Sequence, residues 1–293
     1  MEQFIKERFE GCGLNYDEET RVFSYEDRFS KVKYKEVETI GESEEVPVLA
    51  LYTAQPNTED YRYEGLVSLL YHFYGNDVVV SSVRESVEQM STNAQVIEHS
   101  TLNPKLTVMS NELILRNNQQ SINNHDVCPL VCIMNSYDGS LLLNLGFGLG
   151  IMSQGQLIST ISFRQALGTF RQVHIRGSNT QMVNVIGETV ELISNNLPII
   201  AQQNFNKPIT EDMLLASLDL IEEVGKRRRI EISKSLKEIQ ESNQNLTLWD
   251  LFLAITKFSC SERNINAKMI LENVVERLMV LPTDMINFLR KAA

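Results

Sequence analysis

The chain is short of basic residues, cysteine and long apolar runs. Lys and Arg number 27 against 38 Asp and Glu, and the formal charge of −11 excludes a uniformly basic nucleic-acid or membrane binder. It does not exclude a local basic face. Four scattered cysteines in 293 residues are typical of a reduced compartment. No apolar window reaches the roughly 18 residues of a membrane span, so we expect no transmembrane helix.

Targeting and metal-binding patterns are also missing. The charged N-terminus lacks the apolar segment of a secretory signal, so we expect an intracellular protein. Cys128 and Cys132 are four residues apart, with no second pair or nearby histidine to complete a tetrahedral set, and we expect buried thiols. The four histidines lie far apart in the sequence. We therefore expect no metal site.

Sequence motifs of enzymes are absent as well. Gly146, Gly148 and Gly150 lack the spacing of a dinucleotide-binding loop, and no Walker lysine follows a glycine-rich segment. His125-Asp126 and Tyr137-Asp138 would point to opposite faces if they lay on strands, so neither pair would share a site. The sequence predicts a non-enzymatic protein without a cofactor.

Apolar residues make up 43% of the chain and charged residues 22%, which is enough for a substantial core. The patterning predicts three regions: an acidic N-terminal arm over 1–45, a strand-rich α+β core over 46–178, and a helical region over 179–293 that packs on the core. The predicted fold class is α+β, with an antiparallel-rich sheet in the central region followed by C-terminal helices.

Apolar spacing and turn residues locate the elements of the core. Leucines at helical spacing predict a helix over 60–74, and Asp138-Gly139 predicts a tight hairpin turn. The segment 117–124 is expected to be a loop. Strands are expected at 46–52, 78–83, 106–109, 112–115, 130–135, 140–147, 157–164 and 168–175.

The last third carries helix signals. Apolar residues recur at helical spacing over 180–195, and Thr210 is a candidate N-cap for a helix that Gly225 interrupts. Thr247 to Asp250 has the form of a capping box. The segment 264–290 is expected to hold one or two helices, with Pro282 as a boundary.

Three stretches then suggest a family. Residues 126–140 contain a strand that ends in Asn-Ser-Tyr-Asp-Gly-Ser, Gly146-Phe147-Gly148 follows, and 247–258 (TLWDLFLAITKF) is a late tryptophan-containing helix. These stretches resemble the phage/plasmid-like protein family, a domain of unknown function. The Arg and Cys that this family usually shows after the glycines are missing over 149–155. The resemblance implies a mobile-element origin and residence in the cytoplasm of an infected bacterial host.

Charge is distributed unevenly along the predicted core. Between Glu112 and Glu188 the only acidic residues are Asp126 and Asp138. If the strands 157–164 and 168–175 pair, their alternation places polar and basic side chains on one face, where they suit phosphates and splayed bases. The alternative is an ordinary solvated sheet surface. The candidate binding residues on these strands are Arg164, Arg171, His174 and Arg176.

A second basic feature lies in the helical region. Lys226, Arg227, Arg228 and Arg229 are followed by Lys234, and helical spacing would align part of this set as a stripe for phosphates. The alternative is a solvated helix face whose charge is balanced by Glu222, Glu223, Glu231 and Glu238.

These features predict a phage-encoded protein that binds single-stranded RNA or DNA by phosphate neutralisation and base stacking. Because each basic patch is small, useful affinity would require several copies, so we expect a homo-oligomer. The alternative hypothesis is an interaction protein that binds and inhibits a host protein complex, such as a defence complex. Salt-dependent binding to single strands separates the two hypotheses.

Overall fold

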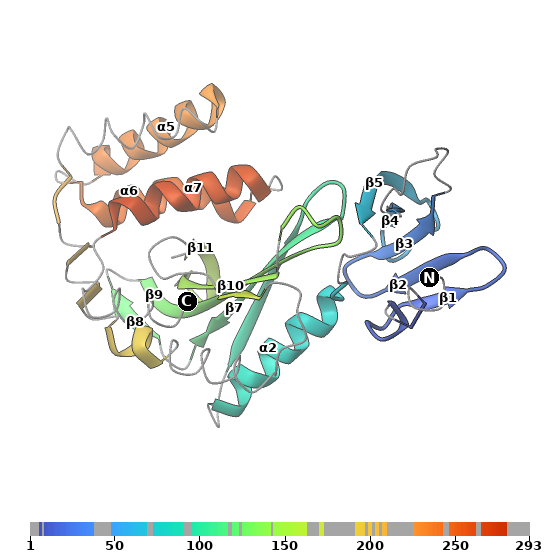
Figure 1. Cartoon of the computed structure of the whole chain (residues 1–293). Coiled ribbons are helices and arrows are strands. Elements are labelled where there is room, and N and C mark those ends of the chain that lie inside the picture. Colours follow the sequence, from blue (N-terminus) through green and yellow to red (C-terminus); the bar gives the residue numbers. More distant parts are fainter. Residues whose placement is uncertain are drawn as a thin grey trace.

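The computed structural model has two antiparallel sheets followed by helices, which confirms the α+β prediction (Figure 1). No helix among the described residues is long and apolar enough to cross a membrane. The structure describes residues 6–7, 9–37, 48–68, 73–90, 95–116, 119–122, 125–141, 143–162, 170–172, 191–196, 199–200, 203–204, 207–209, 225–242, 246–261 and 265–279.

The first sheet has five strands in the order β1-β2-β3-β4-β5. One face buries an aromatic cluster that includes Phe23, Tyr34 and Phe73. Three of its strands lie within the segment expected as an acidic arm, and the last of them, β3, pairs with β4. The strands are β1 (Asn15–Asp17), β2 (Val22–Glu26), β3 (Lys31–Glu36), β4 (Val48–Ala54) and β5 (Arg62–Ser68).

The second sheet has seven strands, with β11-β10-β9-β7-β6 as its main path. The predicted hairpin is confirmed: β9 and β10 pair antiparallel, Gly139 has φ 71°, and the Ser140 N–H donates to Asp138 Oδ1 at 2.9 Å. The strands are β6 (Val96–Leu102), β7 (Val108–Leu115), β8 (Gln120–Ile122), β9 (His125–Ser136), β10 (Leu143–Ser153), β11 (Gln156–Ser162) and β12 (Phe170–Gln172).

Local patterning fails at two neighbouring elements. The helix expected over 60–74 is strand β5 at 62–68, because backbone pairing with β4 decides its conformation. The strand expected over 78–83 lies within helix α2 (Asn76–Met90). Its β-branched Val79, Val80, Val83 and Val87 are all buried against the second sheet. Their three- and four-residue spacing makes one helical face, and tertiary packing overrides propensity there.

Smaller differences concern the second sheet. The strands expected at 106–109 and 112–115 are one strand, β7, and the loop expected over 117–124 contains β8. Cys128 and Cys132 are buried on the same face of β9, as predicted. Burial, together with Asp126, raises the pKa of the Cys128 thiol to about 11.

The helices after the sheets are α5 (Lys226–Ser242), α6 (Leu248–Ser261) and α7 (Ile265–Leu278). In Figure 1 they lie on the side of the second sheet away from α2, and α6 and α7 both contact β11. Residues 191–196 are helical, in the predicted 180–195 segment. The helix expected after Thr210 and the boundary at Pro282 lie outside the described residues.

The predicted capping box at the start of α6 is present. The Thr247 N–H donates to Asp250 Oδ2 at 2.8 Å, and the Thr247 hydroxyl donates to the same oxygen at 2.7 Å. The Asp250 N–H reaches Thr247 Oγ1 at 3.4 Å. These contacts satisfy backbone donors that the first turn of a helix leaves open.

Replacing Thr247 with alanine is therefore expected to lower the free energy of unfolding by about 1 kcal/mol. Urea denaturation followed by far-UV circular dichroism measures the change. Thr247→Ser keeps the hydroxyl and should retain most of the stability. An equal loss in Thr247→Ser would show that the methyl group, and not the cap, stabilises this turn.

The two sheets are joined by a buried polar contact around Tyr137. The Tyr34 hydroxyl donates to the Tyr137 carbonyl at 2.9 Å, and the Tyr137 hydroxyl donates to Asp27 Oδ2 at 3.0 Å. The same hydroxyl accepts the Asn76 N–H at 3.0 Å, while Asp27 Oδ2 accepts the Asp77 N–H at 3.2 Å. The N-terminus of α2 is thus capped by groups distant in sequence.

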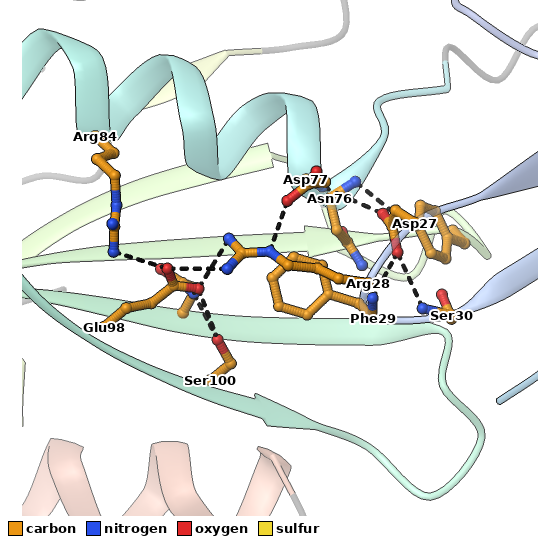
Figure 2. Close-up of polar contacts among 11 residues, drawn as sticks. Asp27, Arg28, Phe29, Ser30, Asn76, Asp77, Arg84, Glu98 and Ser100 are labelled. Atoms are coloured by element: carbon orange, nitrogen blue, oxygen red, sulfur yellow. Dashed lines mark hydrogen bonds and ion pairs between the residues drawn. The ribbon is translucent and has the colours of Figure 1, made fainter. Parts of the chain in front are cut away.

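An ion-pair cluster extends this joint (Figure 2). Arg28 lies between Asp77, at 2.6 Å, and Glu98, at 3.0 Å, and Arg84 approaches Glu98 at 2.9 Å. Burial alone would raise the pKa of Glu98, but the Asn111 amide and the two guanidinium groups hold it below its ordinary value. The first sheet is consequently fastened to α2 and β6 by directional contacts.

A second buried charge cluster fastens α7 to the second sheet. Lys268 of α7 forms an ion pair with Glu112 of β7, and both side chains are fully buried. His99 Nδ1 lies 2.7 Å from Glu112 Oε2, and the Ser110 hydroxyl donates to Oε1 at 3.0 Å. Burial would raise the pKa of Glu112, yet Lys268 and His99 lower it to about 2. Glu112 is therefore ionised in the folded protein.

Candidate nucleic-acid interface

The described part of the strand expected over 157–164, β11, is covered where it was expected to be open. Thr160 and Ile161 are neighbours on β11, so they point to opposite faces, and both are fully buried. The Ser159 hydroxyl donates to Thr256 Oγ1 of α6. Helices α6 and α7 both contact this strand, and the buried Thr160 is therefore closed to a ligand.

The pairing expected between 157–164 and 168–175 is also wrong within the described residues. Both β11 and β12 pair with β10, at different positions along it: Gly150 opposes Thr160, whereas Asn144 opposes Arg171. Arg171 is placed on β12 by its backbone alone. Arg164, His174 and Arg176 lie outside the described residues, so their role stays a prediction.

The basic residues of α5 lie at a helix surface, but nearby carboxylates offset part of their charge. Arg227 and Arg228 both contact Glu231, at 3.1 and 3.0 Å, and Lys234 lies 3.9 Å from Glu238. Hydrogen bonds from Arg227 and Arg228 lower the pKa of Glu231. The side chain of Arg227 is 90% exposed, so such pairs are weak, but they compete with phosphate.

The first sheet carries a more open combination of cations and aromatic rings. Along β3, Val32 and Tyr34 are fully buried in the aromatic cluster, and the intervening Lys31, Lys33 and Lys35 project from the opposite face. We call the exposed part of this face, with its neighbours on β4, on β5 and at the residue that precedes β5, the lysine–tyrosine face. It consists of Lys33, Lys35, Tyr52, Tyr61, Tyr63 and Leu66.

Strand register places these residues in two rows across the sheet. Lys33 opposes Tyr52, which opposes Tyr63, and the two tyrosine rings are 5.6 Å apart between centroids. Lys33 Nζ lies 3.9 Å from the centroid of the Tyr61 ring. In the second row, Ala50 lies between Lys35 and Leu66. Each row therefore begins with a lysine on β3, and the first row continues into the two tyrosine rings.

Exposure and charge distinguish this face from the basic stripe of α5. Tyr63 and Leu66 are 57% and 55% exposed. Lys31, at the edge of the face, is held by Glu59 at 2.5 Å and Glu26 at 3.6 Å. Among the described residues, Lys33 and Lys35 have no carboxylate within ion-pair distance. Glu59 acts on the charge of Lys33 at longer range, but an anionic ligand would meet both lysines without breaking an ion pair.

This face was not among the predicted binding surfaces, although the sequence contains a signal for it. The segment KVKYKE alternates lysine with apolar residues over 31–36, which is the pattern of a half-buried strand with a cationic face. The excess of acidic residues over 1–45 concealed it, because average charge over a segment does not report which side chains share a face.

Comparison of the chain with protein-family models, curated proteins and solved structures found no match. The resemblance to the phage/plasmid-like family stays a prediction.

Proposed function

We propose that this chain is a non-enzymatic protein that binds single-stranded RNA or DNA on its lysine–tyrosine face. Bases would stack on Tyr63 and its neighbour Tyr52, and Lys33 and Lys35 would contact phosphates. Stacking on aromatic side chains of a sheet, combined with cations that follow the backbone, is the physical basis of single-strand binding by many unrelated folds. The proposal concerns the chemistry of this surface and does not depend on a family.

The observation that carries the proposal is the combination of rings and unpaired cations on one exposed sheet face. Tyr63 there is 57% exposed and Tyr52 is half-buried, and Lys33 and Lys35 have no ion-pair partner among the described residues. The chain is acidic overall, and a small cationic face binds a polyanion weakly by itself. Several copies on one strand would supply affinity through avidity, so we retain the proposal of a homo-oligomer.

A charge-reversal experiment tests the face. Lys33→Glu/Lys35→Glu is expected to weaken binding of a fluorescein-labelled single-stranded oligonucleotide by at least tenfold at low salt. Each phosphate contact on a single strand contributes about 0.7 to the slope of log K against log salt, so losing two contacts should flatten it by about 1.4. Fluorescence anisotropy at salt concentrations between about 50 and 300 mM, a range that includes physiological ionic strength, measures the affinity and its salt slope.

The matched control is Arg227→Glu/Lys234→Glu, which makes the same charge change on α5. If the lysine–tyrosine face binds the strand, this control changes affinity only through the net charge and leaves the slope nearly intact. If Lys33→Glu/Lys35→Glu left the affinity unchanged and the α5 variant lowered it, the binding site would lie on α5.

One observation favours a second candidate function, the binding of a host protein. Among the described strands β5 pairs only with β4, and Tyr63 and Leu66 are exposed beside its open edge. An extended peptide could add to this edge by backbone hydrogen bonds. Protein binding of this kind would persist at high salt, and oligonucleotides would not compete with it.

A further inference from the structure

A polar cavity lies behind the edge of the lysine–tyrosine face. It has a volume of about 210 Å³ and lies between the end of β4, the start of β5 and the turn that joins β6 to β7. Drug-sized ligands usually occupy about 300–1,000 Å³, so this cavity suits a smaller group such as one nucleobase. Its lining residues are Thr53, Gln55, Asp60, Arg62, Glu64 and Leu106, together with three others from the same segments.

The wall of the cavity is held in place from two sides. Leu106 has φ 59°, a left-handed conformation that is uncommon for a leucine. Asn103 supports this turn, since its Oδ1 accepts the Thr107 N–H at 2.8 Å. The buried Thr53 hydroxyl donates to the Lys105 carbonyl at 2.7 Å, which ties the turn to β4. Strained backbone that its surroundings maintain is common at ligand sites.

Two opposite charges line the cavity without pairing with each other. Asp60 and Arg62 form no ion pair or side-chain hydrogen bond among the described residues. Glu64 differs, because its side chain is only 8% exposed and lies 3.7 Å from Lys105. The cavity therefore presents one free carboxylate and one free guanidinium. A ligand with adjacent donors and acceptors could use both.

Strand geometry connects the cavity with the lysine–tyrosine face. Side chains alternate along β5, so Tyr63 projects from the outer face, and Arg62, which opposes the buried Thr53, projects to the other side. No further described strand separates them, because β5 is at the edge of its sheet. A single strand that stacks on Tyr63 can therefore pass over this edge and insert its next base.

We infer that the cavity is a guanine-selective subsite for one base of the bound strand, an inference that rests on the proposed function. Guanine presents two adjacent donors, N1–H and N2–H, to a carboxylate such as Asp60. It also presents O6 and N7 as a pair of acceptors, the group with which arginine makes its commonest specific base contact. No other base offers paired donors and paired acceptors together, so guanine satisfies both free charges.

Oligonucleotides that differ at one base test the inference. The intact protein is expected to bind a uridine oligonucleotide with one central guanosine on the order of tenfold tighter than the all-uridine strand, since a bidentate base contact is usually worth that much or more. Asp60→Asn and Arg62→Lys should each remove the preference and leave affinity for the all-uridine strand within about twofold. Glu88→Gln, the same charge change on an exposed side of α2, is the control and should keep the preference.

The outcomes separate the two proposals. Equal affinity for guanosine, adenosine, cytidine and uridine at the central position would overturn the guanine subsite and leave the proposed function intact. A preference that survives both Asp60→Asn and Arg62→Lys would place base selection elsewhere and also overturn it. Failure of every oligonucleotide to bind would overturn the proposed function and the subsite together.

Discussion

Replacing Lys268 with methionine is expected to lower the free energy of unfolding by about 3–5 kcal/mol at neutral pH, the largest effect of any substitution considered for this chain. Lys268 and Glu112 are both fully buried, and removing one partner of a buried ion pair leaves an uncompensated charge in a medium of low polarity. His99 and Ser110 still contact Glu112 and offset part of this cost. Urea denaturation monitored by tryptophan fluorescence measures the loss, with Trp249 as the single reporter.

The double variant Glu112→Gln/Lys268→Met is the control. It removes both charges, so it should recover a large part of the lost stability, because neutral groups of similar shape have no charge to desolvate. Stability as low as in Lys268→Met would mean that packing of the lysine stem, and not the charge, is responsible.

Acid dependence provides an independent test of the same pair. The pKa of Glu112 is lowered from 4.5 to about 2, so its contribution to stability is fully present above pH 4.5 and is lost as the pH falls from 4.5 towards 2. Lys268→Met removes the main attraction that lowers this pKa, and the variant should lose less stability over that interval than the native chain. Identical acid dependence in both proteins would contradict the conclusion that Lys268 lowers the pKa of Glu112.

Replacing Tyr63 with alanine is expected to weaken binding of single-stranded oligonucleotides by about 5- to 150-fold, which corresponds to the roughly 1–3 kcal/mol of one base–aromatic stack. The side chain is 57% exposed and pairs with Tyr52 at the surface. Its removal should therefore change the free energy of unfolding by less than about 1 kcal/mol. Fluorescence anisotropy measures the affinity, and urea denaturation checks the fold.

Two controls accompany this variant. Tyr63→Phe keeps the ring and should retain most of the affinity, because stacking uses the ring and not the hydroxyl. Ile230→Ala removes another exposed apolar side chain, 68% exposed on α5, and should leave binding unchanged. Loss of affinity in Tyr63→Phe equal to that in Tyr63→Ala would show that the hydroxyl, and not stacking, makes the contact.

Elements whose signals are local were predicted well. The Asp138-Gly139 turn and the Thr247 capping box are both present, and helices α6 and α7 begin close to where their first residues indicate. In each case the stabilising contacts join residues a few positions apart, so a short window contains the whole cause.

Elements decided by distant contacts were predicted badly. Val78, Val79 and Val80 favour a strand by propensity, but α2 is capped by Asp27 and Tyr137 and packs its valines on the second sheet. Leucine spacing near Leu66 favours a helix, but β4 supplies a partner strand. Propensity differences are a fraction of a kcal/mol per residue, and such contacts exceed them.

The candidate site also combines features set by residues close in sequence with features set by distant contacts. By itself the sequence determined the class of the fold, the hairpin, the cap, and the alternation that gives β3 one cationic and one apolar face, because all of these depend on neighbours along the chain. Only the tertiary structure decided which polar face meets solvent. It covers β11 with α6 and α7 and leaves Lys35 and Tyr63 exposed, because burial depends on what packs against a face.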